Sequence, residues 1–291
     1  MKLETIPKAD FHDLETLWFQ VSGTLCNLRC THCFISCSPD NHSLEMMDTE
    51  TVLGYLEEAR ELRVREIYFT GGEPFLHKDM TLILESTLRD FPASVLTNGL
   101  PINDARADEL QRIFEDSRYS LEIRISLDDF DEEKNDAVRG KGVFRRALRA
   151  YKRLWDRGTL PILTVTEIRD YLCPRESVLN PYQKYVDLLR SIGVTRPRVK
   201  IIPVFEMGML PTPDSPAFVT PSMMTDFDHS RLQCSASRMV AEDGIYACPI
   251  LVGEDEARMS ETSLEETMRP CRLYHSACTT CYRTGMTCRN Y

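Results

Sequence analysis

Short apolar runs alternate with longer segments whose apolar residues recur at helical spacing, and this alternation continues from residue 17 to residue 203. Parallel strands need a long crossover between them, and this crossover is usually a helix. The alternation therefore predicts an α/β fold with a parallel sheet. A closed barrel would need eight strand–helix units. Here we expect six strands, separated by five helices, at residues 17–21, 66–70, 93–97, 121–127, 161–165 and 198–203.

Three cysteines follow the first expected strand in the pattern C-x3-C-x2-C, namely Cys26, Cys30 and Cys33. Thiolates so closely spaced converge on one small object only if the backbone loops around it. Iron–sulfur cubanes are usually held by four thiolates, so three thiolates would leave one iron open to bind another molecule. Structural zinc is the alternative, with Cys37 as a fourth ligand. The loop by itself leaves both alternatives open.

The second expected strand ends in the sequence G-G-E-P at Gly71 to Pro74, a pattern typical of backbone opened for a ligand. Together with the cysteine loop, it makes the chain resemble the radical S-adenosylmethionine (radical SAM) superfamily from about residue 16 to residue 203. The resemblance implies a partial (β/α)6 parallel barrel, in which the three cysteines hold a [4Fe–4S] cluster. Its open iron chelates S-adenosylmethionine, and one electron then cleaves this cofactor to methionine and a 5′-deoxyadenosyl radical.

Parallel α/β folds bind ligands at the carboxyl ends of their strands, where the polar residues of this chain gather. By the resemblance, the backbone of Gly71 to Pro74 receives the methionine amino group, and Ser126 hydrogen-bonds the ribose or the carboxylate. His32 is expected against the adenine, and Arg139 is a candidate for the methionine carboxylate. The expected cofactor-binding residues are His32, Gly71, Gly72, Glu73, Pro74, Asn98, Ser126 and Arg139. We expect the acidic run 128–133 to be a solvated loop, with Asp128 near the cavity.

The last seventy residues contain six cysteines and resemble the SPASM and twitch extensions of radical SAM enzymes, which carry auxiliary [4Fe–4S] clusters. This resemblance implies one auxiliary cluster held by Cys234, Cys248, Cys278 and Cys281. Cys271 or Cys288 could replace either of the last two, and a zinc ribbon is the alternative. Prolines between residues 210 and 221 indicate a boundary. We therefore expect a barrel over residues 1–210 and a small cysteine-rich α+β domain over residues 211–291.

The composition narrows the classes of partner. The chain has 35 Lys and Arg against 45 Asp and Glu, a net charge of −10, which argues against general nucleic-acid binding. It has no apolar run long enough for a membrane span and no visible signal peptide. Cysteines gathered at the two ends suit metal binding in a reducing compartment. We therefore predict a cytoplasmic protein, and the resemblance implies an electron donor such as flavodoxin or ferredoxin.

Three functions are compatible with these features. About sixteen residues precede the first strand and three follow the last cysteine, which would leave no room for a separate peptide-binding domain. This favours a radical SAM enzyme that oxidises or rearranges a small polar metabolite, assisted by the auxiliary cluster. The second function is radical modification of a ribosomally made peptide or a protein side chain. The third is a non-catalytic metal-binding protein that kept the barrel. No catalytic acid or base is assigned.

Overall fold

A computed structural model describes residues 6–166, 181–210 and 216–285. Cys173 and Cys288 lie outside the described residues. None of the helices in these ranges combines the length and apolar character that a membrane crossing requires.

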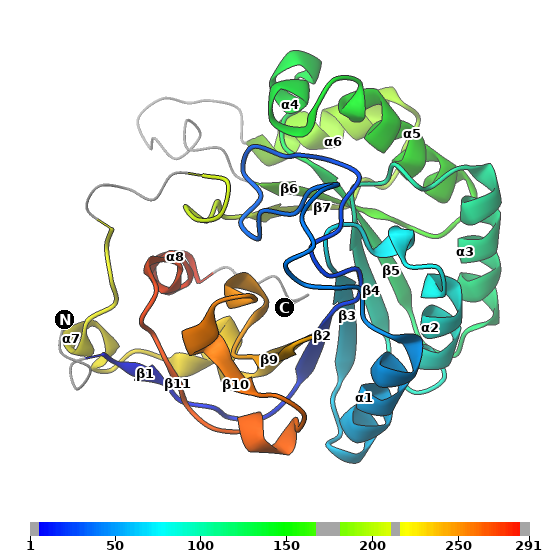
Figure 1. Cartoon of the computed structure of the whole chain (residues 1–291). Coiled ribbons are helices and arrows are strands. Elements are labelled where there is room, and N and C mark those ends of the chain that lie inside the picture. The colour runs from blue at the N-terminus through cyan, green and yellow to red at the C-terminus, as the bar shows by residue number, and fades with distance from the viewer. Residues whose placement is uncertain (1–5, 167–180, 211–215, 286–291) are drawn as a thin grey trace.

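The six predicted parallel strands are all present and lie side by side in one nine-stranded sheet (Figure 1). The strand order is β10-β9-β8-β2-β3-β4-β5-β6-β7. Most of their apolar residues are buried, as the near-continuous apolar runs indicated, whereas those of β7, at the edge of the sheet, are half-buried. The predicted strands are β2 (Thr16–Gln20), β3 (Glu66–Thr70), β4 (Ala93–Thr97), β5 (Leu121–Leu127), β6 (Ile162–Thr166) and β7 (Val199–Ile202).

Five helices connect these strands and flank the outer side of the sheet (Figure 1). The first begins where the sequence predicts, because Asp48 caps it by accepting a hydrogen bond from the amide of Glu50 at 3.0 Å. The helices are α1 (Thr49–Glu61), α2 (Met80–Thr87), α3 (Asp104–Asp116), α5 (Val143–Asp156) and α6 (Pro181–Ser191).

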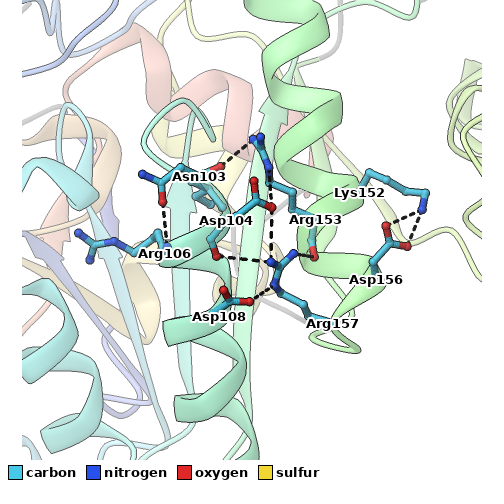
Figure 2. Close-up of polar contacts among 9 residues, drawn as sticks. Asn103, Asp104, Arg106, Asp108, Lys152, Arg153, Asp156 and Arg157 are labelled. Carbon is cyan, nitrogen blue, oxygen red and sulfur yellow. Dashed lines mark hydrogen bonds and ion pairs between the residues drawn. The ribbon is translucent and has the colours of Figure 1, made fainter.

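Polar contacts join α3 and α5 on their outer side (Figure 2). The Nε of Arg157 lies 2.6 Å from Oδ1 of Asp108, and the Nε of Arg153 lies 3.2 Å from Oδ1 of Asp104. The two aspartates are largely exposed, and exposed ion pairs contribute roughly 0–1 kcal/mol each. These contacts help to set the packing of two helices and do not form a site.

The C-terminal segment continues the same sheet instead of forming a separate one. Strand β8 (Ser237–Ala241) runs parallel to β2, and β9 (Gly244–Tyr246) and β10 (Arg258–Ser260) add to it in antiparallel fashion. The hairpin turn consists of Glu242 and Asp243, because Ala241 pairs with Gly244. The division into domains at residue 210 remains a proposal.

The remaining elements lie outside the nine-stranded sheet. Strands β1 (Lys8–Ala9) and β11 (Cys271–Arg272) form a separate two-stranded sheet that joins the two ends of the chain. Two short helices, α7 (Pro221–Met224) and α8 (Ser276–Thr284), complete the C-terminal segment. Helix α4 (Glu132–Arg139) occupies part of the acidic run that we expected to be a solvated loop. That expectation is wrong, and the physical reason is described with the site.

Candidate active site

The cysteine loop lies at the carboxyl ends of the parallel strands, as the α/β fold predicts. Cys26, Cys30 and Cys33 line a cavity of about 180 Å³, and β3 to β7 all contribute to its wall. Of the predicted cofactor-binding residues, the cavity brings together His32, Gly71, Gly72, Asn98, Ser126 and Arg139. Glu73 and Pro74 do not line it and are buried behind it.

The G-G-E-P segment holds the cysteine loop by direct backbone contact. The amide of Gly72 donates to the carbonyl of Gly23 at 2.9 Å, and that of Glu73 donates to the carbonyl of Leu25 at 3.1 Å. A Cβ on Gly72 would lie 2.1 Å from the oxygen of Leu25, so only glycine permits this approach. These amides are already used within the protein, and the role of this segment toward S-adenosylmethionine remains a proposal.

The carboxylate of Glu73 ties this loop to the end of β4. It accepts hydrogen bonds from the Thr97 hydroxyl at 2.7 Å, the Asn98 amide at 2.8 Å and the Phe75 amide at 3.1 Å. Complete burial raises the pKa of Glu73 to about 7, and these hydrogen bonds oppose the rise. The Asn98 side chain then donates to Oδ1 of Asn27, inside the cysteine loop, at 2.7 Å. Glu73 is thus a positioning residue.

Asp128 is the centre of a buried ion network that the sequence did not predict. Its Oδ2 lies 2.7 Å from Nε2 of His32 and 2.6 Å from Nε of Arg139, while its Oδ1 accepts from Nη2 of Arg139 at 3.0 Å. Burial alone would raise the pKa of Asp128, but the Arg139 guanidinium and His32 hold it well below its usual range. His32 and Arg139 are therefore held in place before any cofactor binds.

Helix α4 brings Arg139 to this position. Asp131 caps the helix by accepting from the amide of Lys134 at 3.1 Å, and the carbonyl of Val138 accepts from the amide of Thr31 in the cysteine loop at 2.9 Å. The acidic run is therefore a buried strand end followed by a capped helix. The signal that could have found it is the N-cap aspartate with acidic residues in the first turn and Arg139 in the last.

The thiols of the loop are mostly shielded from water. Burial raises the pKa of Cys26 to about 12 and that of Cys30 to about 11, whereas a hydrogen bond with Cys37 lowers the pKa of Cys33 to about 6. The Cys37 amide lies 3.2 Å from the Cys33 sulfur, so Cys37 is a direct neighbour of the three predicted ligands. Among the described residues, no three metal-binding side chains are close enough to share one metal ion. A cubane takes one thiolate per iron, so its ligands need not share an ion.

The C-terminal cysteines form a second group around two hollows. Cys234, Cys248 and Cys278 line both of them. The larger hollow, of about 100 Å³, adds Cys271, and the smaller, of about 30 Å³, adds Cys281. Ile250 lines both the smaller hollow and the main cavity, so the two cysteine groups lie on either side of shared wall residues.

A parallel sheet with a cysteine loop at its carboxyl edge defines a class of enzyme that works through a cluster-bound cofactor. The sequence profile of the radical SAM superfamily matches residues 21–168, just over half of the chain. The chain therefore belongs to the radical SAM superfamily of enzymes, and this membership implies a [4Fe–4S] cluster and S-adenosylmethionine. It also disfavours the non-catalytic alternative.

Curated relatives share parts of the chain. It is 25% identical to the PqqA peptide cyclase of Granulibacter bethesdensis over 187 residues, which are 64% of this chain and 46% of that protein. It is 34% identical to the mycofactocin maturase MftC of Mycolicibacterium smegmatis over 134 residues, 46% of this chain and 32% of that one. The GTP 3′,8-cyclase of Chlorobaculum tepidum is 31% identical over 144 residues, 48% and 40% of the two chains. The match spans less than half the length of each relative.

Solved structures confirm the fold. Streptococcus suis SuiB superimposes with a TM-score of 0.60 at 14% identity, covering 90% of this chain and 67% of that one. The structure of anSMEcpe with bound AdoMet gives a TM-score of 0.62 at 16% identity, covering 87% and 76%. Likeness at this level of identity shows the α/β architecture alone.

Proposed function

We propose that this chain is a radical SAM enzyme that abstracts a hydrogen atom from an apolar group of a peptide substrate. Cys26, Cys30 and Cys33 would hold the [4Fe–4S] cluster. When bound, the cluster supplies the electron that cleaves S-adenosylmethionine to methionine and a 5′-deoxyadenosyl radical. Superfamily membership supports these cofactors, and the convergence of the three thiols on one cavity supports the ligands.

The side chains around the thiols suit a bound S-adenosylmethionine. Asn98, Ser126 and His32 line the same cavity as the thiols, so each is available to the cofactor. Asp128 engages Nε and Nη2 of Arg139, so Nη1 would bind the methionine carboxylate. The hydroxyl of Thr164, buried in the same wall, has no hydrogen-bond partner among the described residues and would serve the cofactor or the substrate.

The observation that carries the substrate proposal is the lining of the cavity. Its charged side chains, among the described residues, are His32 and Arg139, and both are paired with Asp128. A charged metabolite would therefore find no unpaired counter-charge in the described wall. The rest of the wall is largely apolar, with Phe34, Ile35, Leu96, Ile202, Val204, Phe205 and Ile250. Such a wall fits an apolar side chain better than the small polar metabolite predicted from the sequence.

The names of the relatives support both a peptide and a small metabolite as the substrate. Two of them are named for work on a peptide or a maturation product, which supports a peptide here. A third is named as a cyclase of GTP, a small metabolite, and this keeps the metabolite as the second candidate.

We also propose that the C-terminal cysteines hold an auxiliary [4Fe–4S] cluster. Cys234, Cys248 and Cys278 also line the smaller hollow, which shares Ile250 with the main cavity, so a cluster bound by these three cysteines would be placed to accept an electron from the substrate. No disulfide joins two of the nine described cysteines. This supports a reducing cytoplasm as the location. As electron donor we propose flavodoxin or ferredoxin.

Deuterium transfer tests the proposed activity. The reconstituted enzyme is reduced with dithionite and given peptides encoded near its gene, deuterated in their apolar side chains, or deuterated polar metabolites. We expect deuterium in 5′-deoxyadenosine from a peptide. Transfer only from a metabolite would overturn the peptide proposal while keeping the radical chemistry.

Cysteine variants provide the controls. Changing Cys26, Cys30 and Cys33 together to Ala should remove about four irons per chain and abolish 5′-deoxyadenosine formation. Cys37→Ala should leave cleavage nearly intact. Continued cleavage by the triple variant would mean that the active cluster lies elsewhere.

A further inference from the structure

The two hollows of the C-terminal cysteine group differ in which cysteine completes them. Cys271 comes from strand β11 and lines the larger hollow, whereas Cys281 comes from helix α8 and lines the smaller one. Cys234, Cys248 and Cys278 are common to both. A cluster held by four of these thiolates therefore has two places to lie, and each place has its own fourth ligand.

The larger hollow has more basic than acidic side chains. Its wall includes Arg258, Arg269 and Arg272 beside one carboxylate, that of Glu256, so we call it the arginine-lined hollow. Arg258 pairs with Asp243, but among the described residues Arg269 and Arg272 take part in no ion pair. The Nη2 of Arg272 and the hydroxyl of Tyr274, which lines the same hollow, are buried without hydrogen-bond partners in the described part of the chain. Buried donors without acceptors are costly, so this wall fits an anionic group.

The smaller hollow contains no charged side chain among the described residues. Besides its cysteines, its wall contains the amide of Gln233 and mainly apolar residues, among them Leu232, Leu251 and Leu273. A cubane with four thiolates carries net negative charge, and burying that charge among leucine side chains would be unfavourable. Both its size and its lining make this hollow the poorer place for a cluster.

A buried arginine lies behind the cysteine group. Arg238 is fully buried, and its guanidinium donates to the carbonyls of Cys234 at 2.8 Å, Thr267 at 2.7 Å and Arg269 at 2.9 Å. It thereby fixes the segment before Cys271 against the segment that carries Cys234. None of the ion pairs found among the described residues includes Arg238, so its charge has no carboxylate partner there. A buried cation is favourable only near an anion.

We propose that Cys271, and not Cys281, supplies the fourth thiolate, so that the auxiliary cluster lies in the arginine-lined hollow. Cys234 and Cys271 both line this hollow, together with Cys248 and Cys278. The assignment departs from the C-x2-C pair predicted from the sequence. It rests on the proposed function only in requiring that the C-terminal cysteines bind a cluster.

The test uses the variant without Cys26, Cys30 and Cys33, which leaves the C-terminal site alone. After anaerobic reconstitution, iron, acid-labile sulfide and the paramagnetic signal on reduction are measured with Cys271→Ala or Cys281→Ala added. We expect about four irons in the parent and in Cys281→Ala, and loss of most of that iron in Cys271→Ala. Loss in Cys281→Ala instead, or full loading of both, would overturn the assignment. A parent that binds only zinc would overturn the cluster itself.

Thiol alkylation of the loaded, otherwise unmodified protein provides a second measurement, because Cys271 is buried and its variant could misfold. Cluster ligands resist alkylating reagents until the cluster is removed. We expect Cys281 to be alkylated in the loaded protein and Cys271 only after chelation of the iron. The opposite order of labelling would contradict the proposal without relying on any substitution.

Discussion

Gly72→Ala is the sharpest test of how the cysteine loop is held. The added Cβ would lie 2.1 Å from the carbonyl oxygen of Leu25 and 2.8 Å from Cβ of Cys26, whereas ordinary contact begins at 3.4 Å. The loop must therefore withdraw by roughly an ångström. Overpacking of this kind costs about 1–3 kcal/mol. The withdrawal also lengthens the bond from the Glu73 amide to Leu25, now 3.1 Å, and losing it costs roughly 1 kcal/mol.

The assay compares thermal unfolding of the metal-free proteins and then their iron content after reconstitution. Gly72→Ala should unfold at a lower temperature, by roughly 2–4 °C for each kcal/mol lost, and should load less iron because Cys26 is displaced. Gly54→Ala is the matched control. Gly54 lies in α1, where an added methyl group would meet nothing within 4 Å, and alanine there should stabilise the helix by roughly 1 kcal/mol. Normal stability and full loading of Gly72→Ala would refute the close-approach argument.

Two further perturbations act on buried charges. Asp128→Asn leaves Arg139 without its anion and should cost roughly 3–5 kcal/mol at pH 7 in denaturant titrations. Because the folded-state pKa of Asp128 is depressed, the difference in unfolding free energy between the variant and the unmodified protein should shrink as the pH falls below about 4. A loss under about 1 kcal/mol at pH 7 would contradict the role of Asp128 as the counter-ion of Arg139. Arg238→Met removes a cation beside the proposed C-terminal cluster and should lower the reduction potential of that cluster by roughly 50–100 mV. Arg238→Lys keeps the charge and should shift the potential far less, so equal shifts would exclude the charge as the cause.

Local pattern was sufficient to predict the parallel strands. A strand buried on both faces must be apolar at nearly every position, and runs such as Leu17 to Phe19 or Ile67 to Phe69 leave little alternative. The sequence did not predict that strand β8 joins the parallel sheet beside β2, because Ser237 and Arg238 interrupt its apolar character. Their burial depends on carbonyls supplied by other segments, such as that of Thr267.

Those parts of the site that consist of short motifs of neighbouring residues could be predicted from the sequence. The cysteine loop and G-G-E-P lie together because consecutive strand ends meet at one edge of a parallel sheet. The buried ion network of Asp128 was missed because a run of acidic residues looks solvated until its partners are known. The spacing of Cys278 and Cys281 likewise suggests a pair, while Cys271 is placed by contacts between distant segments, such as the pairing of β11 with β1.

The position of β2 has a consequence for the order in which the protein assembles during synthesis. One edge of β2 pairs with β3, at Thr16 with Glu66. Its other edge pairs with β8, at Thr16 with Ser237, and β8 is synthesised much later. The hydrogen-bond partners described for the cysteine loop, by contrast, all precede β8; the last of them is Met209, whose amide donates to the carbonyl of Cys33 at 2.9 Å. The proposed cluster site at the cysteine loop can therefore form on the ribosome before the proposed C-terminal site exists. Until β8 arrives, β2 presents an unpaired edge that is open to aggregation, so delivery of iron and sulfide to this chain should proceed in two separate stages.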